Sequence, residues 1–134
     1  MPVDLDSMAE NADRIWEESI LPSLSEFIEI HALSPMFEPN WDELGELQAT
    51  LDLFCTWLDN QGLQGMSYNV HRIANHSPVL LVTIEGTGSG EVLFYSHLDK
   101  QPSRPHLWSE GLHPLKAVRR DPFLYGRGSV DDGY

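Results

Sequence analysis

The chain is poor in basic residues and in cysteine. Lys and Arg together number 8 against 21 for Asp and Glu, which gives a net charge of −13 at pH 7. Such an excess of negative charge repels phosphate backbones and anionic headgroups, so we expect neither a nucleic-acid nor a membrane partner. The single cysteine, Cys55, cannot form an internal disulfide, and its place in an apolar helical pattern predicts a buried thiol.

Long apolar runs are also absent. No stretch approaches the roughly 20 apolar residues that a membrane-spanning helix needs, and the acidic residues 1–11 contain no apolar segment of the kind found in secretory signals. The sequence has no internal repeat and no low-complexity tract. With 134 residues, of which 41% are hydrophobic, it predicts a soluble, cytoplasmic globular domain.

Helical periodicity dominates the first half of the sequence. Ser7 and Glu10 form a capping-box pattern at the start of a first helix, and Pro22 is suited to the first turn of a second. A third helix is predicted over residues 41–61, with Gly62 as its stop. The apolar positions of the last two helices recur in steps of three and four: Leu24, Phe27 and Ile28, then Leu44, Leu47, Leu51, Phe54 and Leu58.

Strand patterns fill the second half. Residues 66–73 alternate between apolar and polar, which predicts a half-buried strand, whereas residues 79–84 and 92–95 are continuously apolar, which predicts strands covered on both faces. The glycine-rich residues 86–90 are predicted to form a tight hairpin turn between them. Residues 115–119 and 123–125 predict two further short strands. Helices followed by buried strands favour an α/β layered architecture.

Two polar residues follow the apolar run at residues 92–95. His97 and Asp99 are two positions apart, so in an extended segment their side chains point to the same side. Ligands of open α/β sheets bind at the carboxyl ends of strands. An imidazole can bind a metal through one nitrogen while its other N–H is held by a carboxylate, so Asp99 is predicted as either the orienting partner of His97 or a ligand itself.

A second acidic group lies close to the end of the sequence. Asp131 and Asp132 are adjacent carboxylates in a glycine-flanked loop, where backbone can approach a cation closely. One carboxylate can bridge two metal ions, an arrangement suited to water activation. The pattern alone also fits a simpler interpretation, in which the aspartates form a solvated turn and His97 makes a structural contact with Asp99.

A family resemblance favours the metal site. Residues 93–102 read LFYSHLDKQP and residues 124–133 read LYGRGSVDDG. In this order and at this separation, they resemble two motifs of the zinc metallopeptidase family that contains carnosinases, bacterial dipeptidases, aminoacylases and succinyl-diaminopimelate desuccinylases. The resemblance implies that residues 1–134 are the N-terminal portion of a three-layer αβα catalytic domain, with the remainder of that domain and a lid and dimerisation domain absent.

The resemblance also implies a role for each matched residue. His97 would bind one zinc ion, Asp99 would orient His97, and Asp131 would bridge two zinc ions, with Mn²⁺ or Co²⁺ as alternative metals. The activity implied is hydrolysis, by metal-activated water, of the amide bond of a dipeptide or an N-acyl amino acid. The sequence departs from the family pattern at three places: Ser96 replaces a usual glycine, Lys100 replaces a common apolar residue at a position suited to touching substrate, and Gly133-Tyr134 replaces a frequent Lys-Gly.

The matched residues do not make a complete catalytic site. The family's Glu-Glu pair, which includes the general base, a further acidic ligand and a second histidine have no match in residues 1–134. A catalytic zinc ion normally has three protein ligands, so we expect this chain alone to be inactive and to bind zinc weakly. The full-length protein is expected to be a homodimer, and the chain itself to self-associate through uncovered apolar surface. The alternatives are an inactive binding or interaction module and a small α/β protein without metal.

Overall fold

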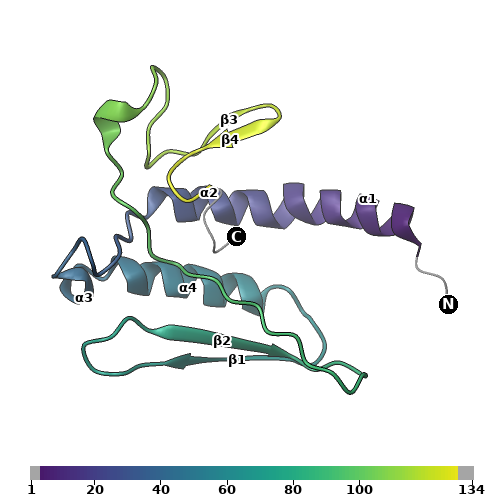
Figure 1. The fold of residues 1–134 in the computed structure, drawn as a ribbon. Coiled ribbons are helices and arrows are strands. Elements are labelled where there is room, and N and C mark those ends of the chain that lie inside the picture. Colours follow the sequence, from purple (N-terminus) through teal and green to yellow (C-terminus); the bar gives the residue numbers. More distant parts are fainter. Residues whose placement is uncertain (1–3, 130–134) are drawn as a thin grey trace. The chain divides into compact units, whose positions relative to one another are not determined.

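The computed structural model describes residues 4–129, which fall into two compact units. The first unit contains residues 4–31 and 103–129, and the second contains residues 32–102. Both combine helices with a small antiparallel sheet of two strands (Figure 1). This mixed composition agrees with an α/β protein at the coarse level. Over the described residues, no helix has both the length and the apolar character required to cross a membrane.

The first unit begins with an uninterrupted helical rod made of α1 (Leu5–Ile15), the π-helical segment η1 (Trp16–Ile20) and α2 (Leu21–Glu29) (Figure 1). The prediction that Ser7 caps the first helix is wrong, because the helix begins one turn earlier. Asp4 has extended backbone, and its carboxylate accepts a hydrogen bond of 3.2 Å from the backbone N–H of Ser7. A carboxylate at this position satisfies a first-turn amide that has no partner within the helix.

The π-helical segment accommodates Pro22. The Leu21 N–H bonds to the carbonyl of Trp16, five residues earlier, rather than four. Pro22 has no N–H to donate, and its ring would crowd the carbonyl in the preceding turn of a regular helix. Pro22 lies in the first turn of α2, as predicted. The predicted apolar face of α2 is confirmed as buried: Leu24, Phe27 and Ile28.

A hairpin and a tight loop complete the first unit. β3 (Val118–Arg120) and β4 (Phe123–Tyr125) pair antiparallel, which confirms two short strands, although the first begins at residue 118 rather than 115. The short 3₁₀ helix η2 (Pro105–Leu107) precedes them. After β4, Gly126 lies directly against α2, where a Cβ atom would be 2.4 Å from Cγ2 of Ile28.

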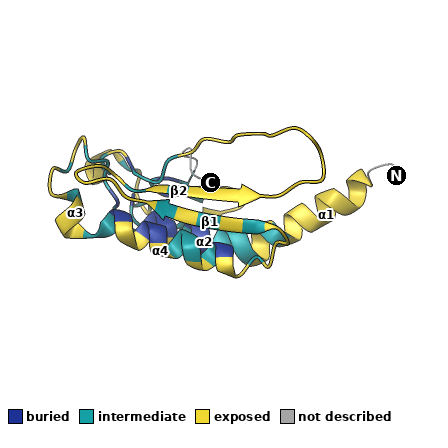
Figure 2. Cartoon of the chain, turned by 90° about the horizontal axis from the view of Figure 1, so that it is seen from below, coloured by how far each residue is buried: buried dark blue, intermediate teal, exposed yellow. Residues whose placement is uncertain are grey.

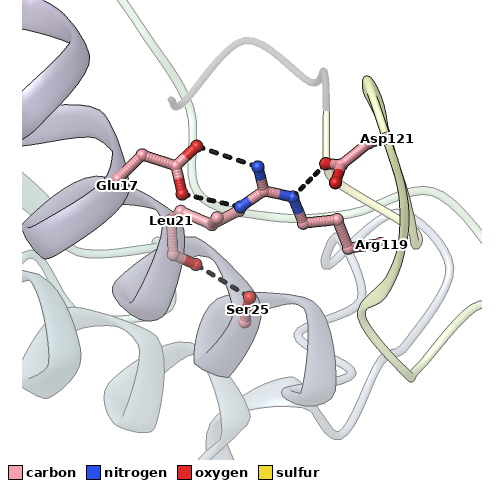
Figure 3. A network of polar contacts seen from close by, with 5 residues as sticks. All are labelled: Glu17, Leu21, Ser25, Arg119 and Asp121. Carbon is pink, nitrogen blue, oxygen red and sulfur yellow. Dashed lines mark hydrogen bonds and ion pairs between the residues drawn. The ribbon is translucent and has the colours of Figure 1, made fainter.

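An ion-pair network fastens the hairpin to the helical rod (Figure 3). The guanidinium of Arg119 donates two hydrogen bonds, of 2.6 and 2.9 Å, to the carboxylate of Glu17 in η1, and a third, of 2.5 Å, to Asp121. The bonds from Arg119 hold the pKa of Glu17 below its usual value. The same bonds raise the pKa of Arg119, which remains charged at all relevant pH values.

Replacing Arg119 with methionine is expected to raise the pKa of Glu17 towards the ordinary value for glutamate. Because the folded-state pKa of Glu17 is lowered, the pair stabilises the fold above the unfolded-state pKa, and this stabilisation is lost as the pH falls through the folded-state pKa. An NMR titration of the Glu17 carboxyl carbon measures the change. Arg14→Met is the matched control, because Arg14 pairs with Glu18 at 3.1 Å. An unchanged Glu17 pKa in Arg119→Met would contradict the prediction.

In the second unit, the predicted helix over residues 41–61 is divided in two. Gly45 adopts a left-handed conformation, with φ of 70°, between α3 (Trp41–Leu44) and α4 (Glu46–Asp59). A single αL residue ends one helix and redirects the chain, so the predicted apolar stripe does not include Leu44, which is exposed. Three of the four remaining positions follow the prediction, because α4 buries Leu47, Leu51 and Leu58, whereas Phe54 is only half-buried.

A β-hairpin lies beside α4. β1 (Met66–His71) and β2 (Val79–Ile84) pair antiparallel along their whole length (Figure 1). The Tyr68 hydroxyl bonds to Asp59 at the end of α4, and Arg72 bonds to Gln48. The predicted alternation of β1 is confirmed, with every second residue half-buried. The prediction that β2 is buried on both faces is wrong: most of its residues are exposed (Figure 2).

The predicted buried strand at residues 92–95 is not formed. These residues have no strand pairing with any described part of the chain, and their exposed fractions lie between 80% and 88%. Consequently, the glycine-rich residues 86–90 do not connect two strands. An apolar run becomes a buried strand only where a neighbour satisfies its backbone and other layers cover its faces. Over residues 4–129, no element provides either for this segment.

Candidate metal centre

His97 and Asp99 contact each other in the second unit. Nδ1 of His97 is 3.2 Å from Oδ1 of Asp99 and 3.0 Å from the Asp99 backbone oxygen. Both side chains are about two-thirds buried, with exposed fractions of 30% and 29%. Two oxygens at one ring nitrogen favour the neutral tautomer that carries its proton on Nδ1. In that tautomer, Nε2 has the lone pair that a metal ion requires.

A backbone bridge holds the segment that contains this pair. The N–H of Lys100 donates to the carbonyl of Ala32 at 2.8 Å, and the N–H of Ser34 donates to the carbonyl of Lys100 at 3.0 Å. Together they make an isolated parallel bridge between Leu33 and Lys100. The residue next to Asp99 is therefore fixed to a turn that lies far away in the sequence.

Two residues that take part in the hydrogen bonds of this bridge, Lys100 and Ala32, are unusual. Lys100 has an exposed fraction of only 1%, and lysine is rarely buried to this extent. Ala32 is fully buried and has a left-handed backbone with φ of 37°, a conformation that costs a residue with a Cβ atom. The sequence marked Lys100 only as a departure from the family motif, and nothing in its pattern indicates that it is buried.

Asp131, the third predicted site residue, and Asp132 lie outside the described residues. Backbone hydrogen bonds hold the segment that leads towards them. The N–H of Arg127 donates to the carbonyl of Pro114 at 2.7 Å, and the N–H of Ser129 donates to Gly126 at 3.3 Å. Nε of Arg127 is buried and has no hydrogen-bond partner among residues 4–129. Sequence reasoning did not identify this donor, and a buried orphan nitrogen has no signature in a sequence.

The described residues do not assemble a set of metal ligands. Across residues 4–129, no group of three or more His, Cys, Asp or Glu side chains is placed to hold a metal ion. The His97–Asp99 pair does match the ligand and orienting carboxylate found around zinc. Because a catalytic zinc ion has three protein ligands, the pair can make one corner of such a site, and other residues would have to supply the remaining ligands.

Cys55 and Tyr68 of the second unit do not provide a nucleophile. Cys55 is half-buried rather than fully buried as predicted. This partial burial raises the pKa of its thiol, which therefore stays protonated near neutral pH. The hydrogen bond of 2.9 Å to Asp59 raises the pKa of Tyr68 to about 12. Neither group is thus prepared for nucleophilic or acid–base chemistry at neutral pH.

Comparison with known proteins leaves the family open. No family model matches this chain, and none of the curated proteins does.

Proposed function

We propose that this chain is part of a dinuclear zinc hydrolase that cleaves the amide bond of a dipeptide or an N-acyl amino acid. The observation that supports the proposal best is the geometry at His97, whose Nδ1 faces two oxygens of Asp99. This geometry favours the tautomer in which Nε2 has the lone pair. The sequence resemblance supplies the reaction and the substrate class. In this proposal, the mixed helices and hairpins form the N-terminal portion of a three-layer αβα catalytic domain.

Each site residue has a distinct task in this proposal. His97 holds one metal through Nε2, and Asp99 keeps the proton on Nδ1 and fixes the direction of the ring. Asp131 provides a carboxylate with two oxygens, enough to bridge two ions. When bound, the zinc pair polarises the substrate carbonyl and lowers the pKa of water. The remaining ligands and the general base come from residues that these 134 do not contain.

Zinc binding to the purified chain tests the proposal. Isothermal titration with Zn²⁺, and absorption spectra with Co²⁺, should show weak binding that His97→Ala and Asp131→Ala abolish. Asp99→Asn should weaken it by about 10- to 100-fold, the usual effect of removing a partner that orients a metal-bound histidine. His71→Ala is the matched control, because His71 is exposed on β1. Equal affinities in the unaltered chain and His97→Ala would refute the assignment.

Hydrolysis provides a further check. With dipeptides and N-acyl amino acids as substrates, the 134-residue chain should show no turnover above buffer in the presence of zinc. Vigorous turnover that disappears in Asp131→Ala would instead show that these residues suffice for catalysis.

A second candidate function, an inactive binding or interaction module, is favoured by one observation. Residues 92–95 present four large apolar side chains that are at least 80% exposed, and such surface commonly marks a protein contact. Sedimentation velocity tests this alternative together with the expected self-association. Concentration-dependent association without zinc binding would favour the module over the hydrolase.

A further inference from the structure

The bridge between Leu33 and Lys100 lies one residue beyond the His97–Asp99 pair. Its two hydrogen bonds fix both the N–H and the carbonyl of Lys100. Because the backbone of Lys100 is fixed, the conformations open to residues 97–99 directly before it are restricted. The remainder of the stretch before it, residues 92–95, has no such restraint and is exposed. The bridge therefore marks the point at which the segment becomes hydrogen-bonded to another part of the second unit.

Burial makes this bridge more than a passing backbone contact. Lys100 has an exposed fraction of 1%, and Ala32, whose carbonyl accepts its N–H, is completely buried. The left-handed Ala32, which accepts the Lys100 N–H, adds backbone strain that the surrounding structure has to hold in place. The bridge is therefore a buried contact of defined geometry directly beside the His97–Asp99 pair.

We propose that Lys100 is a positioning residue for the candidate metal centre: its buried side chain and its bridge to the turn at Ala32 hold His97 and Asp99 in contact. This inference rests on the proposed function for its biological meaning. Its physical content is independent of any metal: the state of the His97 ring depends on an intact bridge.

The state of the ring can be read without metal or substrate. With ¹⁵N-labelled histidine at pH 8, where imidazole is neutral, the ring nitrogen shifts distinguish one fixed tautomer from a mixture. In the unaltered chain, His97 should be held with its proton on Nδ1. His71, exposed on β1, should give the averaged shifts of a free ring and so provides an internal reference.

Ser34→Pro removes one of the two hydrogen bonds of the bridge and so weakens it, while leaving Lys100, His97 and Asp99 unchanged in sequence. Proline removes the N–H that donates to the Lys100 carbonyl, whereas the control Ser34→Ala retains it. In Ser34→Pro, the Lys100 amide should exchange with solvent at least tenfold faster, and His97 should become a mixture of tautomers. Ser34→Ala should behave as the unaltered chain. Lys100→Ala, which removes the buried side chain, should both speed the solvent exchange of the Ser34 amide and make His97 a mixture of tautomers.

The outcomes separate this inference from the proposed function. If the Lys100 amide exchanges freely in Ser34→Pro, the β1–β2 amides stay protected and His97 keeps a single tautomer, then Lys100 does not position the pair and the inference is overturned. If a variant also loses the exchange protection of the β1–β2 amides, a urea titration of the unaltered chain decides. The inference requires that the His97 tautomer and the exchange of the Lys100 amide change at the same urea concentration; a tautomer that changes only at higher urea overturns it. A chain that binds no zinc but keeps a single His97 tautomer dependent on the bridge would overturn the proposed hydrolase function and leave the positioning role of Lys100 intact.

Discussion

Replacing Gly126 with alanine is expected to destabilise the first unit by about 2–3 kcal/mol, the upper part of the range of about 1–3 kcal/mol that is usual for overpacking a filled site. The added Cβ would lie 2.4 Å from Cγ2 and 2.9 Å from Cδ1 of Ile28. Ile28 is fully buried on α2 and cannot turn away without disturbing its neighbours. Chemical denaturation followed by the circular dichroism of the helices measures the loss.

A paired substitution identifies the cause. Ile28→Ala removes the clashing atoms, so Gly126→Ala should cost much less in that background than alone, which gives a clear coupling in a double-mutant cycle. Gly88→Ala is the matched control, because no atom lies within 4 Å of a Cβ placed there. Additive effects of Gly126→Ala and Ile28→Ala would show that the loop does not pack on α2 as described.

Leu51→Ala is expected to have the second large effect, a loss of about 3 kcal/mol from the second unit. Leu51 is 1% exposed on α4, and truncating a buried leucine removes its transfer free energy and leaves a cavity. Urea denaturation monitored by tryptophan fluorescence gives the change in the free energy of unfolding.

Leu44→Ala is the informative control for Leu51→Ala. The same substitution at Leu44, which is 55% exposed beyond the break at Gly45, should cost less than about 1 kcal/mol. One continuous helix with both leucines on the core face predicts similar losses at the two positions. Similar losses would therefore contradict the break.

Local patterns in the sequence predicted the elements that form from nearby residues. The apolar faces of α2 and α4, the alternation of β1 and the β3–β4 hairpin depend on spacing along a short stretch, and the structure confirms them. Local competition produced the small errors: Asp4 displaces Ser7 as the cap, and Gly45 adopts a positive φ inside an otherwise good helical pattern. Asp4 and Ser7 are both suitable capping residues, and a glycine is compatible with either a helix interior or a helix end. A sequence pattern does not say which of these alternatives is more stable.

Features that depend on distant residues were not predictable in the same way. Continuous apolar runs predicted buried strands at residues 79–84 and 92–95, but burial depends on which other elements are available to cover them. At the candidate site, the contact of His97 with Asp99 follows from their separation by two positions. The bridge between Leu33 and Lys100 and the ion pair between Arg119 and Glu17 join residues far apart in the sequence, so no local pattern predicts them. The prediction for Asp131 lies outside the described residues.

The bridge between Leu33 and Lys100 also has a kinetic consequence. It closes a loop that contains α3, α4 and the β1–β2 hairpin, so its formation costs the entropy of a long chain closure, whereas each of those elements forms from neighbours in the sequence. The helices and the hairpin should therefore form first during refolding, and the ordering of residues 97–100 should come last. A stopped-flow experiment would then show the His97–Asp99 contact appearing in a slow phase, after most secondary structure is complete.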